Sequence, residues 1–275
     1  MEYIDILVTV DDNYIDRLKV MLTSLKICNR NEKIRVYLMH RCIGSEKIDD
    51  LRKCLDAFEY EFCPVKVDES LFENAPVSKR YPQEMYYRLC APALLPDTID
   101  KILYLDPDML VINSIRPLWE LDMGKHIFAA ASHTTGSEIA SNINKIRLGT
   151  DSEYFNSGVL LIDLKRGREK INVNDIFEYT KEHKNELLLP DQDVLNALYG
   201  NEILGLDDTV WNYDARRYNY YFLKSGGEAD YEWVMKNTVI LHFCGKAKPW
   251  DKHYIYRFGG LYKHYMRLKE IYMDK

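Results

Sequence analysis

Two aspartates interrupt one of the most hydrophobic segments of the chain. Asp106 and Asp108 stand two positions apart in KILYLDPDMLVINS, residues 101–114, directly after an apolar run. Charged side chains are rare in such a run unless they are paired or bind a cation. Pro107 disfavours a helical conformation at Asp106, and side chains two apart in an extended segment face the same way. The pair can therefore present two carboxylates to Mg²⁺, Mn²⁺ or Ca²⁺, or form a solvated turn.

A histidine near the C-terminus offers a third ligand. His242 ends another apolar run in VILHFCGKAKPW, residues 239–250, and Gly245 opens a basic turn with Lys246 and Lys248. An imidazole beside two carboxylates favours Mn²⁺ over harder ions. The lysines suit the neutralisation of a pyrophosphate. A buried, hydrogen-bonded histidine followed by a solvated basic loop is the alternative interpretation.

The elements that must position these residues alternate between strands and helices over the first half of the chain. Apolar patterns predict strands at residues 4–10, 33–40, 63–68, 102–105, 126–132, 158–164 and 238–245, and helices at about residues 14–27, 45–58 and 84–95. This alternation predicts βαβ units and a mostly parallel sheet with right-handed crossovers. Ligands of such sheets bind beyond the carboxyl ends of the strands, where VTVDDNY (8–14) and LYLDPDM (103–109) both place their acids.

Composition narrows the classes of function. The chain has 275 residues, of which 47% are hydrophobic, with no repeat or linker, so we expect one domain. A net charge of −6 argues against a nucleic-acid partner. The six cysteines form no CxxC pair, which predicts reduced thiols and no zinc site. Without a signal peptide or an apolar run of roughly 18–20 residues, we expect the chain in the cytoplasm, with the inner face of the cell membrane as an alternative.

Six motifs resemble, in order, those of family 8 glycosyltransferases, the bacterial lipopolysaccharide galactosyl- and glucosyltransferase type related to glycogenin. They are VTVDDNY (8–14), YYRL (86–89), ILYLDPDMLV (102–111), YFNSGVLLIDL (154–164), LPDQDVLNALY (189–199) and LHFCGKAKPW (241–250). Together they extend over nearly the whole chain, and six matches in order make chance a poor explanation. The resemblance implies one GT-A domain over residues 1–275, with a Rossmann-like mixed, mostly parallel α/β sheet flanked by helices.

The resemblance also implies an activity. Family members transfer a hexose from a UDP-sugar with retention of anomeric configuration, so we expect glucose or galactose to pass from UDP to an acceptor. A lipopolysaccharide or other cell-surface saccharide or glycolipid is the expected acceptor. By this resemblance Asp106, Asp108 and His242 hold Mn²⁺, with Mg²⁺ as the alternative ion.

Three other functions are weighed against this one. The same chemistry on a protein acceptor, the enzyme itself included, is the first alternative. A sugar-phosphate nucleotidyltransferase is disfavoured, because such an enzyme opens with a Gly-rich basic loop where this chain has DDNY at 11–14. A nucleotide-sugar-binding protein without turnover is disfavoured, because every matched position keeps a chemically capable side chain.

Further residues acquire roles through the resemblance. The implied donor-binding residues are Thr9, Asp11, Asn13, Arg88, Asn156, Asp191, Gln192, Gly245 and Lys248. Asp11 and Asn13 match the family's contacts to uracil and ribose, and Gly245 and Lys248 its contacts to pyrophosphate. Arg88 matches an arginine that binds donor sugar and phosphate.

Each of these roles has a structural alternative. Asp11 and Asn13 suit an N-cap for the following helix, and Asp191 and Asp193 suit capping after Pro190. Taken alone, Arg88 reads as a solvated helix residue. Arg80 is a weaker basic candidate near it.

Asn156, Asp191 and Gln192 match residues that hold the donor sugar, and Asp191 and Gln192 are the implied catalytic pair. Gln192 is expected near the anomeric carbon on the face opposite the leaving group. Because an amide is a poor nucleophile, we favour front-face attack by the acceptor hydroxyl over a covalent double displacement. In that mechanism the departing phosphate takes the proton.

Two segments remain outside these motifs. In residues 252–275 the spacing of Leu261, Tyr265 and Leu268 predicts a basic amphipathic helix, which we expect to dock on the domain in preference to contacting a membrane. Residues 132–151 are polar and precede the sugar-binding motif, so we expect a lid or acceptor loop there.

Overall fold

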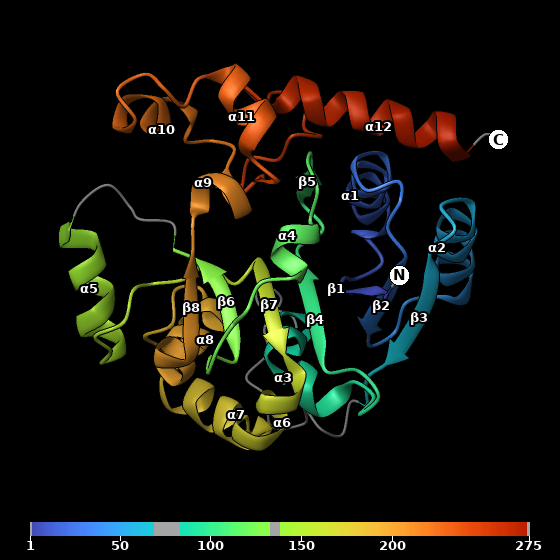
Figure 1. Ribbon diagram of the computed structural model, residues 1–275. Helices are drawn as coiled ribbons and strands as arrows, with labels where there is room; N and C mark the ends of the chain where they lie inside the picture. The colour runs from blue at the N-terminus through green and yellow to red at the C-terminus, as the bar shows by residue number, and fades with distance from the viewer. Residues whose placement is uncertain (1, 69–82, 133–137, 274–275) are drawn as a thin grey trace.

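A computed structural model describes residues 2–68, 83–132 and 138–273 (Figure 1). Within these residues the strands are β1 (Ile4–Thr9), β2 (Ile34–His40), β3 (Glu61–Lys66), β4 (Lys101–Leu105), β5 (Met109–Val111), β6 (Phe128–Ala131), β7 (Val159–Asp163), β8 (Ile203–Leu206), β9 (Tyr213–Asp214) and β10 (Ile240–His242). The helices are α1 (Ile15–Cys28), α2 (Ser45–Ala57), α3 (Tyr87–Leu94), α4 (Arg116–Trp119), α5 (Glu138–Leu148), α6 (Leu164–Lys170), α7 (Val173–Glu182), α8 (Pro190–Tyr199), α9 (Asp208–Trp211), α10 (Tyr218–Lys224), α11 (Tyr231–Asn237) and α12 (Gly259–Met273), with 3₁₀-helices η2 (Gln83–Tyr86) and η3 (Gly200–Glu202).

The central sheet has seven strands in the order β3-β2-β1-β4-β7-β6-β8. Strand β1 pairs in parallel with β2 and β4, β2 with β3, and β6 with β8, whereas β7 is antiparallel to both β4 and β6. Only β7 is therefore reversed, which confirms the predicted mixed, mostly parallel sheet. Because β1 and β4 are parallel neighbours, the residues that follow Thr9 and Leu105 lie next to each other beyond the carboxyl ends of the two strands.

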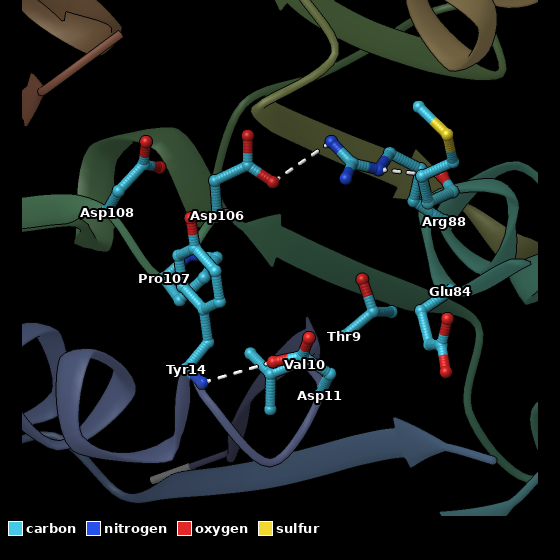
Figure 2. Close-up of a pocket in the computed structure, with 10 residues that line it drawn as sticks. Thr9, Val10, Asp11, Tyr14, Glu84, Arg88, Asp106, Pro107 and Asp108 are labelled. Carbon is cyan, nitrogen blue, oxygen red and sulfur yellow. Dashed lines mark hydrogen bonds and ion pairs between the residues drawn. The ribbon is translucent and has the colours of Figure 1, made fainter. Parts of the chain in front are cut away.

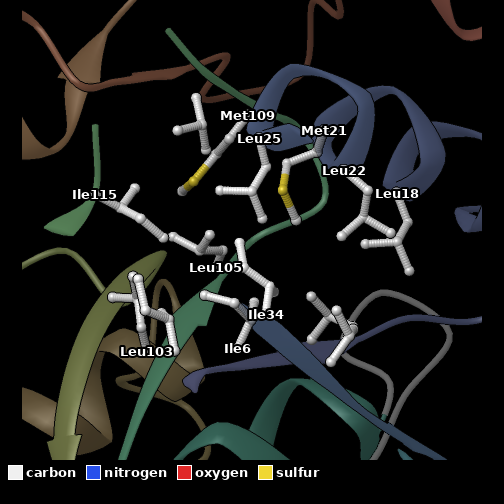
Figure 3. Close-up of a cluster of buried hydrophobic side chains, with 14 of the residues drawn as sticks. Ile6, Leu18, Met21, Leu22, Leu25, Ile34, Leu103, Leu105, Met109 and Ile115 are labelled. Carbon is white, nitrogen blue, oxygen red and sulfur yellow. The ribbon is translucent and has the colours of Figure 1, made fainter. Parts of the chain in front are cut away.

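Helices cover both faces of this sheet, which is why its inner strands β1, β4, β6 and β7 are nearly continuous apolar runs. In β1 the side chains of Ile6 and Val8 pack with α1, whereas Leu7 belongs to the cluster that includes α3. Figure 3 shows the α1 side of this packing, with these residues: Leu18, Met21, Leu22, Leu25, Ile6, Leu103 and Leu105. Each such buried side chain contributes about 1.5–3 kcal/mol, so the strand ends that carry the acids rest on a rigid core.

A second sheet, in the order β5-β10-β9, lies beyond the end of β4. Strand β10 is parallel to β9 and antiparallel to β5, with His242 opposite Met109. The amide of Phe243 also donates a hydrogen bond of 3.0 Å to the carbonyl oxygen of Asp108. This pairing brings the end of β10, from the last part of the chain, beside the turn at residues 106–108.

Two predicted boundaries are corrected. The helix expected at 84–95 divides into η2 and α3, and Leu95 is already extended because Pro96 disfavours the helical conformation before it. The helix expected over 252–275 begins at Gly259, since residues 252–258 form turns and irregular structure. Residues 274–275 lie outside the described residues.

Helix α12 packs against α1 and α2 across one end of the molecule (Figure 1). The side chains of Tyr262 and Tyr265 are buried in this contact region. Docking of the apolar side on the protein is therefore observed, as expected. Across residues 2–68, 83–132 and 138–273, none of the helices combines the length and apolar character that crossing a bilayer demands.

Candidate functional site

A pocket of about 230 Å³ opens at the carboxyl ends of β1 and β4 (Figure 2). Its lining comes from the end of β1, from η2 and α3, and from the turn after β4: Thr9, Val10, Asp11, Tyr14, Glu84, Met85, Arg88, Asp106, Pro107 and Asp108. Four of these side chains are acidic, and only Arg88 is cationic. An acid-rich pocket suits an anionic ligand when cations accompany that ligand.

Three of the predicted residues meet at this pocket: Asp106 and Asp108 line it, and His242 lies beside them without lining it. Asp106, Asp108 and His242 each offer one ligand atom, and these atoms lie within 4.8 Å of one another. The Nε2 atom of His242 is 3.4 Å from Asp108 Oδ1 and 3.8 Å from Asp106 Oδ2. Two carboxylates and an imidazole are a donor set that fits a divalent cation, Mn²⁺ in particular. The described part of the chain contains no second group of this kind.

Lys248, Arg88 and the imidazole of His242 compensate the acids. The ammonium group of Lys248 contacts Asp108 and donates to the Phe243 carbonyl at 3.0 Å. Burial alone would raise the pKa of Asp108, but His242 and Lys248 outweigh it and hold that pKa below its usual range. Burial raises the pKa of Asp106, although Arg88 opposes this effect. Asp108 is therefore the more strongly stabilised anion of the pair.

Arg88 is a buried residue of α3 and not the solvated helix residue of the alternative interpretation, with 8% of its surface exposed. Its Nη1 atom lies 2.9 Å from Asp106 Oδ1 and 3.4 Å from Asp191 Oδ2. The same atom donates to the Ser157 carbonyl at 3.1 Å, and the guanidinium carbon lies 4.4 Å from the ring centroid of Tyr104. Arg88 thus joins the turn after β4 to the first turn of α8.

A chain of amide side chains connects His242 to Gln192. The Nδ1–H of His242 donates to Asn212 Oδ1 at 2.9 Å, and Asn212 Nδ2 donates to Asn156 Oδ1 at 2.8 Å. Asn156 Nδ2 in turn donates to Gln192 Oε1 at 3.0 Å. With its Nδ1 held in this way, the histidine turns Nε2 toward the two carboxylates.

Asn212 is a site residue that the sequence reasoning missed. It is fully buried and follows the four-residue helix α9, so no helical or strand pattern marks it. The one available signal is a polar side chain between two large aromatic residues, Trp211 and Tyr213. A buried amide in such a setting requires hydrogen-bond partners, and Asn156 and His242 supply them.

Gly158 leaves room for this arrangement. A Cβ atom at position 158 would lie 2.6 Å from His242 Cε1, 2.7 Å from Asp106 Oδ2 and 3.0 Å from Asn156 Oδ1. Its amide donates to Asn156 Oδ1 at 3.0 Å, and its carbonyl accepts from the Asp106 amide at 2.9 Å. The backbone at Gly158, just before β7, therefore approaches the candidate metal ligands more closely than a residue with a side chain would allow.

Two acids at the start of α8 have different surroundings. Asp191 accepts a hydrogen bond of 2.8 Å from the Ser157 hydroxyl and pairs with Arg88 near the pocket. Asp193 is fully buried and accepts the amides of Leu188 and Leu189 at 2.6 and 3.1 Å. The structural alternative therefore applies to Asp193, which ties down the chain ahead of α8, whereas Asp191 lies among the site residues.

The predicted nucleotide contacts lie after β1. Asp11 Oδ1 accepts the amides of Asn13 and Tyr14 at 2.9 and 3.2 Å and so holds the turn ahead of α1. Neither Asp11 nor Asn13 is the N-cap that the structural alternative predicts, because that position is Tyr14, whose side chain makes no capping hydrogen bond. Asp11 also lines the pocket, whereas the exposed Asn13 does not belong to the lining. Thr9 lines it as well, with its hydroxyl 3.3 Å from that of Tyr104.

The basic turn after β10 brings one of its two lysines to the site. Lys248 contacts Asp108, whereas Lys246 is exposed. Gly245 adopts a φ of 81°, a backbone conformation that favours glycine, and a Cβ there would also displace the guanidinium of Arg216. Gly245 does not line the pocket, and its contact with pyrophosphate stays a prediction.

Two expectations concern residues that are only partly described. Arg80 lies outside the described residues. Helix α5 occupies most of the segment 132–151, while 133–137 fall outside the described residues. The lid or acceptor loop expected there stays a prediction.

Comparison with known proteins gives a consistent result along almost the entire chain. The model of the family described as Glycosyl transferase family 8 matches residues 5–253. General stress protein A of Bacillus subtilis (strain 168) is 30% identical over 273 residues, which cover 96% of this chain and 93% of that protein. The lipopolysaccharide 1,2-glucosyltransferase of Escherichia coli (strain K12) is 26% identical over 270 residues, covering 95% and 77%.

The fold is also found in solved structures. That of the galactosyltransferase LgtC, in complex with donor and acceptor sugar analogues, superposes with a TM-score of 0.79 over 96% of both chains at 23% identity. This likeness shows that the fold is of the predicted GT-A type. Because the family model extends over most of the sequence, the protein belongs to glycosyl transferase family 8.

Proposed function

We propose that this protein is a retaining hexosyltransferase that moves glucose or galactose from a UDP-sugar to a saccharide or glycolipid acceptor. The observation that carries the proposal is the convergence of Asp106, Asp108 and His242 beside a pocket that the two aspartates line together with Thr9 and Asp11. A relative named for lipopolysaccharide 1,2-glucosyl transfer supports a cell-surface glycolipid as acceptor. We place the reaction in the cytoplasm, or at the inner face of the membrane where such acceptors are anchored.

The residues of the site fit Mn²⁺, with Mg²⁺ as the second choice. Asn212 fixes the tautomer of His242, and the absence of a Cβ at Gly158 keeps space beside both donor groups. Asp106, Asp108 and His242 would hold the ion, which supplies a Lewis acid for the negative charge that develops on UDP. Lys248, which contacts Asp108, adds a positive charge suited to the same diphosphate.

The donor hexose would lie against Asn156, Asp191 and Gln192. Their side chains are held by neighbouring protein groups, because Asn156 bonds to Gln192 at 3.0 Å and Ser157 bonds to Asp191 at 2.8 Å. The guanidinium of Arg88 contacts both Asp191, on the proposed sugar-binding side, and Asp106, one of the candidate metal ligands. One positive charge therefore connects the two parts of the site. Such preorganisation supports orientation of the anomeric carbon as the main contribution of these residues.

We propose front-face attack by the acceptor hydroxyl, with the departing phosphate accepting its proton. The Gln192 amide is neutral and engaged with Asn156, which makes it a poor nucleophile. Incubation with a fluorinated UDP-hexose, followed by intact-mass and peptide analysis, is expected to show no adduct on Gln192 or Asp191. A hexosyl adduct on either residue at a catalytically competent rate would exclude this mechanism.

The proposed activity is tested by nucleotide release. With UDP-glucose, UDP-galactose, UDP-N-acetylglucosamine and a GDP-sugar supplied in turn, we expect UDP release from one hexose donor, dependent on Mn²⁺ and abolished by EDTA. Intact-mass measurement of the same samples separates transfer to the protein itself, the alternative acceptor, from hydrolysis or transfer to an added saccharide. Absence of release from every donor, together with no rise in Tm with UDP and Mn²⁺, would refute the proposed function.

A further inference from the structure

The segment that enters β7 and the first turns of α8 are joined residue by residue. Each of the consecutive residues 154–157 forms a hydrogen bond with an α8 side chain: Tyr154 with Asp193 at 2.6 Å, Phe155 with Asn196 at 2.7 Å, Asn156 with Gln192 at 3.0 Å and Ser157 with Asp191 at 2.8 Å. Gln192 and Asp191 belong to the proposed sugar-binding side. Asp193 and Asn196 are both fully buried. We call this set of four hydrogen bonds between residues 154–157 and α8 the seam.

Asp193 is the most heavily bonded member of this seam. Besides Tyr154 and the amides of Leu188 and Leu189, it receives two hydrogen bonds from Arg147, one to each carboxylate oxygen, at 2.7 and 2.8 Å. Burial alone would raise the pKa of Asp193, but the bonds from Arg147 and Tyr154 outweigh it and lower that pKa. The side chain is thus a buried carboxylate whose charge is neutralised by one bidentate guanidinium.

Arg147 comes from a different element, α5. Its Nη1 also donates to the Glu186 carbonyl at 3.1 Å, and its Nη2 to Asn144 Oδ1 at 3.2 Å. One side chain therefore ties together α5, the connection before α8, and α8 itself. Only arginine among the cationic residues offers enough fixed donors for this arrangement.

We propose that the Arg147–Asp193 ion pair is a positioning device for catalysis, which sets the first turn of α8 and with it the orientation of Asp191 and Gln192 toward the donor hexose. This inference rests on the proposed function of the site. Asp193 is the neighbour of Gln192 in the sequence. Without the Arg147–Asp193 ion pair, the part of α8 next to the Gln192 amide would no longer be held in place. Displacement of a reacting or orienting group by about 1 Å costs on the order of 100-fold in rate.

The test compares Arg147→Met with a matched variant, Arg35→Met. Arg35 forms an equally bidentate pair with the buried Asp5, at 2.7 and 3.0 Å, between the amino-terminal ends of β1 and β2 and away from the pocket. At a temperature where circular dichroism shows both variants folded, Arg147→Met is expected to lower kcat about 100-fold with the donor KM little changed. Arg35→Met is expected to keep the wild-type kcat. Arg147→Lys retains the positive charge but not the bidentate guanidinium, so its kcat is expected to lie between those of Arg147→Met and wild type.

A second readout needs no turnover. Hydrogen exchange of the amides of residues 190–196 is expected to accelerate in Arg147→Met relative to both wild type and Arg35→Met. A wild-type kcat in folded Arg147→Met, an equal loss in Arg35→Met, or unchanged exchange in α8 would overturn the inference. If wild type itself releases no UDP, the proposed function fails, and the exchange measurement alone still decides whether Arg147 positions α8.

Discussion

Asp108→Asn is expected to reduce cation-dependent UDP release by on the order of 10²–10³-fold, the loss typical when one preorganised electrostatic group leaves an active site. The substitution keeps the size of the side chain and removes its charge. Asp108 Oδ1 is 3.4 Å from His242 Nε2, and the other oxygen contacts Lys248, so the asparagine would leave two potential cations facing each other. A divalent ion would then meet one carboxylate in place of two, which weakens its binding.

Two measurements separate this effect from simple destabilisation. Mn²⁺ and UDP together are expected to raise the Tm of wild type and not that of Asp108→Asn. Asp163→Asn is a matched control, because Asp163 ends the antiparallel strand β7 and so lies at the end of the sheet opposite to the pocket. Its side chain caps α6 by accepting the Arg166 amide at 2.8 Å. This substitution should change stability little, because asparagine caps a helix about as well as aspartate, and the variant should keep its activity. Retention of Mn²⁺-dependent release in Asp108→Asn within a few-fold of wild type would contradict the assignment of Asp108.

The sequence was sufficient to predict the strand ends that build the site. Apolar runs followed by acids at Asp11 and Asp106 placed both groups at the carboxyl edge of a parallel sheet, and β1 and β4 are indeed parallel neighbours. This worked because strand alternation and turn residues are local properties. The reversal of β7 leaves no such local trace, since its apolar run reads the same in either direction.

Contacts between distant segments were beyond local reasoning. His242 reaches Asp108 only because β10 pairs with β5, and nothing within either short strand specifies that partner. The resemblance to family 8 placed His242 with Asp106 and Asp108 as metal ligands, without predicting the strand pairing that brings them together. For Arg88, local reasoning gave the wrong environment. Taken alone, its position in a helix predicted exposure to solvent, whereas tertiary packing buries it between Asp106 and Asp191.

One reason explains why the sequence did not predict two features of the site, the amide chain through Asn212 and the Arg147–Asp193 pair. Both are networks whose members are satisfied only in the folded state, and their partners lie on separate elements. A buried polar side chain predicts that partners exist without identifying them. Position 158 belongs to the same class, because the sequence around this glycine, which was predicted to begin a strand and lies just before β7, does not show which groups will lie against it.

Gly158→Ala is expected to lower kcat by about 100-fold, through displacement of the groups that the new methyl would meet. The nearest are His242 Cε1 at 2.6 Å and Asp106 Oδ2 at 2.7 Å, both belonging to candidate metal ligands, followed by Asn156 Oδ1 at 3.0 Å. These side chains are held by Asn212, Arg88 and Gln192, so none can move without breaking another contact. Overpacking of this kind costs about 1–3 kcal/mol of stability, which most folded proteins survive.

Gly205→Ala provides the comparison, because a Cβ on that β8 glycine would lie 3.7 Å from Phe155 Cε1, an ordinary van der Waals contact. Steady-state kinetics with the active UDP-hexose and a Mn²⁺ titration monitored by Tm are expected to show impaired cation binding in Gly158→Ala alone. Equal kinetics for the two alanine variants would mean that the site tolerates a methyl group beside His242 and Asp106. In that case the close approach of the backbone at Gly158 would serve the packing beside the sheet, and the tight spacing of the three ligand groups would not be needed for transfer.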